Sequence, residues 1–77
     1  MDMKEFYKKK KKDAVAQMAA LCENPVEDSW RGMHEADAFV HEHGTSNDIS
    51  NADLILNHWS HYDCELETIE ETNKKEN

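Results

Sequence analysis

The sequence predicts an all-α protein, a single small domain folded as a bundle of three helices. Its 77 residues contain one proline and two glycines, whereas Ala, Glu, Lys, Met and Leu, which favour helix, are frequent. No stretch alternates β-branched and polar residues as a half-buried strand does. Capping signals and apolar stripes place the helices at about 13–23, 25–43 and 51–72.

The first helix is expected to pack from about residue 13 to residue 23. Its apolar stripe consists of Ala14, Val15, Met18, Leu21 and Cys22. Five consecutive lysines precede it, and at about 100° per residue they surround a helix and leave no face for the core. We therefore expect residues 1–12 to form a basic arm, either helical or mobile, although Asp2 and Glu5 have the spacing of a capping box.

Asn24 and Pro25 mark the expected start of the second helix. Asn24 would be the N-cap, Pro25 the first helical residue, and Glu27 lies three residues after the cap. The helix should run to about His43, where Gly44 would supply a left-handed C-terminal stop. One side of this helix is apolar and carries Val26, Trp30, Met33, Ala36 and Val40, with Phe39 somewhat off that side.

Ser50 and Asp53 predict the start of the third helix. They have the spacing of a capping box, and Ile49 can pack on Leu54 across it. An apolar stripe with coiled-coil-like spacing follows, made of Ile55, Trp59, Tyr62, Leu66 and Ile69. We expect the helix to continue to about Thr72, closing an acidic helical domain over 13–72, and to leave a frayed polar tail over 73–77.

The short length of the chain predicts self-association. A domain of this size buries only about 60% of the surface that its unfolded chain exposes. A homo-oligomer joined along the third helix would shelter its large aromatic side chains more completely. The residues expected at that seam are Ile55, Tyr62, Leu66 and Ile69.

Charge is divided sharply along the chain, whose formal net charge is -8. Residues 1–12 carry six lysines and two acidic residues, whereas residues 13–71 carry fourteen acidic residues and a single base, Arg31. Such a field repels nucleic acid and membrane surfaces and attracts basic protein surfaces.

Residues 1–5 lack the apolar segment of a signal peptide. We expect a cytoplasmic protein, with reduced cysteines, that binds neither nucleic acid directly nor membranes.

No catalytic function and no cofactor are predicted. The sequence contains no Gly-rich phosphate loop and no His-Glu-x-x-His motif, and a bundle this small has little room for an acid–base pocket. His58, His61 and Cys64 recur at every third position and are weak candidates for a metal site, to which His41 and His43 could contribute from a facing helix. Because no Cys-x-x-Cys pair accompanies them, we interpret them as surface residues.

The leading functional hypothesis is the capture of another protein. Carboxylates would attract a basic surface and aromatic residues would supply affinity, and carboxylates spaced along helices can also imitate DNA phosphates. The candidate partner-binding residues are Trp30, Glu35, Asp37, Phe39, Glu42 and Trp59. In length, acidity and helical composition the chain resembles the small host-takeover and counter-defence proteins of bacteriophages, a resemblance that carries no functional residue across. It implies an inhibitor or adaptor that captures a host transcription, nucleoid or proteolytic complex.

Two alternatives remain open at this point. In the first, the chain is a self-associating regulatory protein whose lysine arm binds an anionic ligand. The arm would use Lys8, Lys9, Lys10, Lys11 and Lys12, although we interpret these lysines first as a solvated arm that can lie against the carboxylates of the third helix. In the second, the chain is a metal-responsive module that uses His58, His61 and Cys64.

Overall fold

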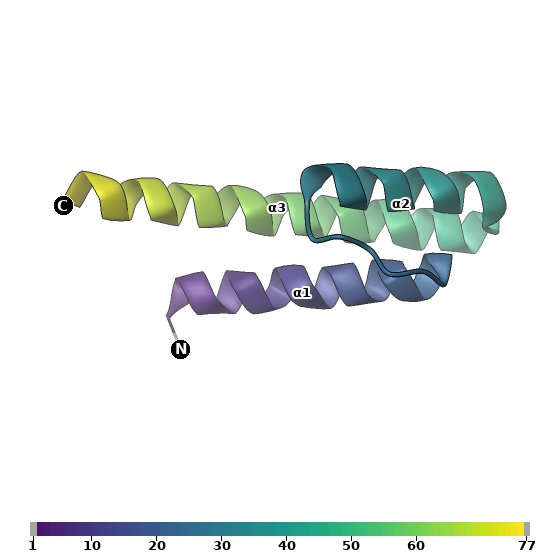
Figure 1. Cartoon of the computed structure of the whole chain (residues 1–77), viewed down its shortest axis with the longest axis horizontal. Coiled ribbons are helices and arrows are strands. Elements are labelled where there is room, and N and C mark those ends of the chain that lie inside the picture. The colour runs from purple at the N-terminus through teal and green to yellow at the C-terminus, as the bar shows by residue number, and fades with distance from the viewer. Residues whose placement is uncertain (1, 77) are drawn as a thin grey trace.

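The computed structural model describes the backbone of residues 2–76 and the side chains of residues 2–72, and this part of the chain is all-helical. Its three helices are α1 (Met3–Cys22), α2 (Trp30–His43) and α3 (Ser46–Glu76). Helices α1 and α2 run in the same direction and α3 returns antiparallel to both (Figure 1). The predicted all-α bundle of three helices is therefore confirmed, whereas the oligomeric state stays a prediction.

Helix α1 begins ahead of the lysine run. Asp2 caps it, as its spacing to Glu5 predicted, and its side chain accepts a hydrogen bond from the Glu5 backbone N–H at 2.9 Å. The helix passes without a break through residues 8–12 and ends at Cys22. The expectation that no lysine of this run could pack overlooked the long apolar stem of lysine, which can be buried while the ammonium group pairs with an acid. Lys11 packs in this way.

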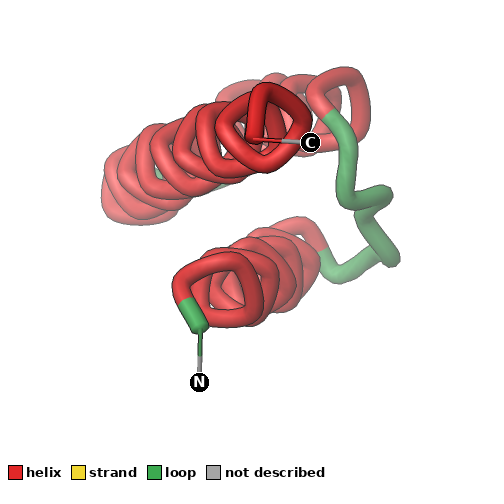
Figure 2. Tube along the Cα trace, turned by 90° about the vertical axis from the view of Figure 1, so that its left-hand side faces the viewer, coloured by secondary structure: helices red, strands yellow, loops and turns green. Residues whose placement is uncertain are grey.

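Helix α2 begins at Trp30 rather than at Pro25. Ser29 is its N-cap, and the Ser29 Oγ accepts a hydrogen bond from the Gly32 N–H at 3.0 Å. Residues 23–29 instead form a connection, drawn as a loop beside the helices in Figure 2, that returns from the end of α1 to the middle of the bundle (Figure 1). Because α2 runs parallel to α1, the chain must travel back along α1 first, and seven extended residues reach about 23 Å.

Helix α3 begins at Ser46, before the predicted capping box. The box that forms is an earlier one: the Thr45 N–H donates to Asp48 at 3.2 Å, and the Asp48 N–H donates to the Thr45 hydroxyl at 3.1 Å. Ser50 therefore lies inside the helix. The helix continues past Thr72 to Glu76, and Asn77 lies outside the described residues. A helix of 31 residues is about 46 Å long, which accounts for the longest dimension of the molecule, 47 Å.

Gly44 ends α2 in an extended conformation, not in the predicted left-handed one. Its φ is -89°, and its N–H donates to the Val40 carbonyl at 2.7 Å. A Cβ at this position would lie 2.7 Å from the Val40 carbonyl oxygen and 3.0 Å from the Asp48 Cβ. The glycine is therefore needed because two helices approach closely at a very short connection.

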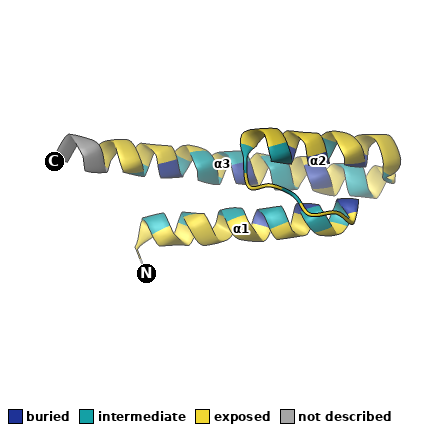
Figure 3. Ribbon diagram, in the orientation of Figure 1, coloured by how far each residue is buried: buried dark blue, intermediate teal, exposed yellow. Residues whose placement is uncertain are grey.

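The core lies between all three helices and is centred on Trp59, which is 1% exposed. Its other buried members are Ala14, Met18, Cys22, Met33, Ala36, Val40 and Ala52. Figure 3 shows that the buried residues concentrate where α2 covers the α1–α3 pair, with Leu66 buried further along α3. Within the helices that the structure describes, none is long and apolar enough to cross a membrane.

Helix α2 covers only part of the α1–α3 pair. It lies over the first half of α3, whereas the beginning of α1 and the later turns of α3 pair with each other alone (Figure 1). We call the part that α2 does not cover the open half; it consists of residues 3–12 of α1 and 62–72 of α3. The molecule thus offers two kinds of surface: grooves beside α2, and the surface of the α1–α3 pair in the open half.

Candidate functional site

A groove lies between the end of α1, the 23–29 connection and α2. It consists of two adjoining hollows of about 310 and 470 Å³ that share Cys22, Asn24 and Phe39, and we call it the Phe39 groove. Its apolar lining includes Val26, Ala36, Phe39 and Val40, and its acidic lining consists of Glu23, Glu27, Glu35 and Asp48. Among the described residues that line it there is no lysine or arginine.

Phe39 is the prominent aromatic side chain of this groove. It is 41% exposed, and its ring centroid lies 4.5 Å from that of His43. The buried side of α2 is formed by Met33, Ala36 and Val40, so Phe39 projects beside the core instead of into it. An aromatic side chain beside a hollow with both apolar and acidic lining can anchor an apolar residue of a partner.

The remaining predicted partner-binding residues do not share one surface. Trp30 is 62% exposed and stacks near His34, with 4.1 Å between the ring centroids. It lies nine residues before Phe39, which at about 100° per residue is the opposite flank of α2. Glu42 is exposed on the outer side of α2. Trp59 was predicted to meet a partner, but its burial in the core takes it out of reach.

Glu35 lines the Phe39 groove and is also paired on the surface. Its carboxylate accepts a hydrogen bond from the Arg31 Nε at 2.9 Å, one turn away. This hydrogen bond, together with the charge of Glu35, raises the pKa of Arg31 above its ordinary value. Both side chains are well exposed, so the pair is easily exchanged for another partner.

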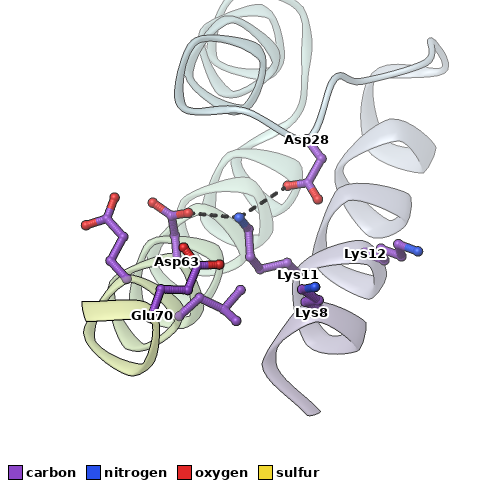
Figure 4. A pocket seen from close by; sticks show the side chains of 8 residues that line it. Lys8, Lys11, Lys12, Asp28, Asp63 and Glu70 are labelled. Carbon is purple, nitrogen blue, oxygen red and sulfur yellow. Dashed lines mark hydrogen bonds and ion pairs between the residues drawn. The ribbon is translucent and has the colours of Figure 1, made fainter. Parts of the chain in front are cut away.

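Trp59 organises a polar contact at the border of the open half. Its indole Nε1 donates to the Asp28 carboxylate at 2.7 Å. The Lys11 ammonium lies 2.8 Å from Asp63, 4.0 Å from Asp28 and 5.0 Å from the centroid of the Trp59 ring. Figure 4 shows Lys11 reaching between the two carboxylates while Lys12 points away from them. Sequence reasoning missed Asp28 and Asp63, because their partners lie 31 and 52 residues away.

The lysine run does not form a uniform anion site. Lys11 is engaged internally, whereas Lys8, Lys9, Lys10 and Lys12 are exposed. The hollow beside Lys11, of about 550 Å³, is lined by lysines from α1 but also by four acidic residues: Asp28, Asp63, Glu67 and Glu70. These carboxylates would repel an anionic ligand, so the geometry does not favour the anion-binding alternative.

The predicted self-association stripe faces α1 of the same chain. Leu66 is buried, and Ile55, Tyr62 and Ile69 are half-buried. Tyr62 lies beside Tyr7 of α1, with 6.0 Å between the ring centroids, and Ile55 packs against the core. Tyr62 and Ile55 thus make contacts within one chain, and a dimer that used them as its seam would compete with these contacts.

The candidate ligands His58, His61 and Cys64 are exposed along α3, and the rings of His58 and His61 lie near that of Tyr62. Within the described part of the chain, a different set brings three ligand atoms within 4.8 Å of one another: Asp37, His41 and Asp53. We call this set the Asp–His–Asp cluster. Asp37 and His41 lie one turn apart on α2, and Asp53 faces them from α3.

The Asp–His–Asp cluster is held by short polar contacts. His41 Nε2 lies 2.7 Å from Asp53 Oδ1 and 3.6 Å from Asp37 Oδ2. The other Asp37 oxygen, Oδ1, is shielded from solvent and accepts a hydrogen bond from none of the described residues. The Asp37–His41 spacing was readable in the sequence, but nothing there indicated that Asp53 would join them instead of capping α3.

The cluster shifts the pKa values of its members in different directions. The hydrogen bond to Asp53 raises the pKa of His41 and lowers that of Asp53. The pKa of Asp37 is raised, first by burial and then by its contact with Asp53, while the charges of His41 and His34 oppose this rise. Two carboxylates therefore compete for the positive charge that lies between the helices.

Comparisons with protein-family models, with curated proteins and with solved structures find no match for this chain. The resemblance to small bacteriophage proteins consequently rests on composition alone. Function has to be inferred from the Phe39 groove, the Asp–His–Asp cluster and the distribution of charge.

Proposed function

We propose that this chain is a non-catalytic protein-binding module whose Phe39 groove receives a basic, amphipathic segment of another protein. The observation that supports this most directly is the composition of the groove, in which an exposed Phe39 and an apolar floor are combined with four carboxylates and no lysine or arginine among the described lining residues. A segment that presents an apolar residue between lysines or arginines matches both features.

The apolar part of the groove would supply most of the affinity. The core is complete without Phe39, because Trp59, Met18, Met33 and Val40 already fill it. An exposed aromatic residue is therefore free to pack on a partner, where buried aromatic anchors typically dominate the binding energy. The two adjoining hollows leave room for an apolar side chain of the partner on either side of Phe39.

The carboxylates would increase the rate of association and the selectivity for basic partners. A net charge of -8 attracts basic surfaces over about one Debye length and accelerates encounter with them. Glu35 can exchange its exposed pairing with Arg31 for a basic residue of the partner without leaving a buried charge unpaired. Binding should accordingly weaken as the salt concentration rises.

The inhibitor or adaptor role predicted from composition belongs to the same proposal. A nucleic-acid-handling target would offer the basic surface to which acidic helices bind, and the carboxylates would then take the place of DNA phosphates. A proteolytic complex would instead be redirected by an adaptor. The identity of the captured protein distinguishes these two modes.

The test compares Phe39→Asp with Phe6→Asp, a matched control because Phe6 is similarly exposed, at 39%, but lies at the beginning of α1. Immobilised wild-type protein is used to retain partners from bacterial lysate under washes of rising salt, and affinity is then measured with the purified partner. We expect Phe39→Asp to weaken binding at least tenfold, equivalent to about 1.4 kcal/mol, and Phe6→Asp to leave it within about twofold. Equal effects of the two substitutions would contradict the proposed site.

A further inference from the structure

We propose that Asp37, His41 and Asp53 bind one divalent transition-metal ion, for which Zn²⁺ is the best match, and that the ion ties α2 to α3. This inference is independent of the proposed function, because the cluster lies on the flank of α2 opposite the Phe39 groove. The sequence placed its weak metal candidates His58, His61 and Cys64 on α3, with His41 and His43 as possible contributors, and of these only His41 belongs to the cluster.

The donor atoms already lie close to a coordination geometry. Zinc bonds of about 2.0–2.2 Å in a tetrahedron place ligand atoms about 3.3 Å apart. His41 Nε2 and Asp37 Oδ2 are 3.6 Å apart, and all three donor atoms fall within 4.8 Å of one another. The hydrogen-bonded pair, His41 Nε2 and Asp53 Oδ1 at 2.7 Å, would have to open slightly to reach this spacing. Both side chains are partly exposed and can make that adjustment.

The Asp37 carboxylate gives a second reason for a cation at this position. Its side chain is only 16% exposed, and its Oδ1 is shielded from solvent without a hydrogen bond from any residue that the structure describes. A buried carboxylate oxygen without a partner is unfavourable. Near it stands a second carboxylate, Asp53, so that with neutral His41 the cluster carries two negative charges. A divalent ion would neutralise both charges, and an ion bound through both oxygens of Asp37 would also give the buried Oδ1 a partner.

The donor set selects the class of metal. One imidazole nitrogen and two carboxylate oxygens suit zinc and neighbouring transition metals. Calcium takes six to eight oxygen ligands, and magnesium prefers oxygen ligands in octahedral geometry, so His41 disfavours both. Three protein ligands leave a fourth tetrahedral position that is open to water or to a donor group of another molecule.

The test uses untagged protein, stripped with a chelator and titrated with Zn²⁺ by calorimetry. The matched variants are His41→Gln and Asp53→Asn in the cluster and His58→Gln outside it. We expect one zinc ion per chain in the wild type and in His58→Gln. Because loss of even an outer partner of a metal ligand weakens binding about 10–100-fold, each cluster variant should bind at least tenfold more weakly. Co²⁺ should give the visible absorption of a four-coordinate site, which the cluster variants lose.

Three results would overturn the proposal: less than one zinc ion per chain, unchanged affinity in His41→Gln, or an equal loss in His58→Gln, which would assign binding to the α3 histidines. Asp37→Asn provides a readout that misfolding cannot imitate. Without metal this variant should melt at or above the wild-type temperature, because one of two neighbouring carboxylates is removed. The zinc-induced rise in melting temperature should nevertheless disappear, and its persistence would exclude Asp37 as a ligand.

Discussion

Across the contact between α2 and α3, His41 and Asp53 form a hydrogen-bonded pair whose contribution depends on pH. The pKa of His41 is raised above its ordinary value of 6.5 by this hydrogen bond, so its contribution to stability is complete below about pH 6.5 and is lost as the pH rises through the raised value. The pKa of Asp53 is lowered from 3.8, so its contribution is lost only as the pH falls through that lowered value. The pair should stabilise the metal-free fold most between about pH 4 and pH 6.5.

Raising the pH from 6 to 8 should therefore reduce the free energy of unfolding of the metal-free protein. The raised pKa of Asp37 has the same sign, because folding opposes its ionisation: its contribution is complete below about pH 3.8 and is lost as the pH rises through the raised value. Urea unfolding in the presence of a chelator at pH 6, 7 and 8 measures the slope. His41→Gln should flatten it, whereas His61→Gln, at an exposed position outside the cluster, should leave it unchanged. A slope that survives in His41→Gln would assign the pH dependence to other groups.

The helix boundaries illustrate how alternative capping signals compete. The sequence offers two boxes for α3, Thr45 with Asp48 and Ser50 with Asp53, and the structure uses the first. The second is not formed because Asp53 accepts a hydrogen bond from His41 and Ala52 is completely buried. Likewise, Ser29 caps α2 in place of Asn24 because the preceding residues bring Asp28 to Trp59. In both cases a long-range contact decides between two local signals.

Substitution of the two hydroxyl residues distinguishes the boxes. Thr45→Ala removes the acceptor of the Asp48 N–H and should lower the free energy of unfolding by about 1 kcal/mol. Ser50→Ala, at an exposed position inside α3, should change it by less than about 0.5 kcal/mol. Urea denaturation at one pH measures both. A larger loss for Ser50→Ala would show that the later box forms in solution.

At the scale of the whole molecule, the bundle is uneven along its length. Three helices enclose the core around Trp59, whereas the open half is a pair of helices joined by Leu66, by the Tyr7–Tyr62 contact and by the Lys11–Asp63 ion pair. Local opening requires less free energy where fewer apolar groups are buried. The region that α2 covers should therefore be the stable part of the protein, and the open half should open first.

Hydrogen exchange of backbone amides tests this gradient within a single helix. Backbone amides at 52–59 lie in the part of α3 that packs in the three-helix core. They should exchange slowly, at rates that approach those of global unfolding. Amides at 66–72 should exchange at least tenfold faster, because only α1 packs against that region. Uniform protection along α3 would contradict this gradient of stability. It would indicate that another molecule, such as a second copy of the chain, covers the open half.

Residue periodicity and composition by themselves determined the class of this fold. The apolar stripes through Met18, Met33 and Trp59 predicted three helices and named most of the core, because a helical spacing of apolar residues leaves few other ways to bury them. The Asp2 cap was also readable, since it depends on neighbours three residues apart. Charge asymmetry, likewise a property of the sequence alone, led to the expectation of a basic partner.

Only the tertiary structure decided which of these local signals operate and which side chains meet. It buried Trp59 and packed Lys11 between Asp28 and Asp63. It also assembled Asp37, His41 and Asp53 from two helices. These outcomes depend on the crossing and register of helices, which are set by packing over the whole core and leave no periodic trace in the chain.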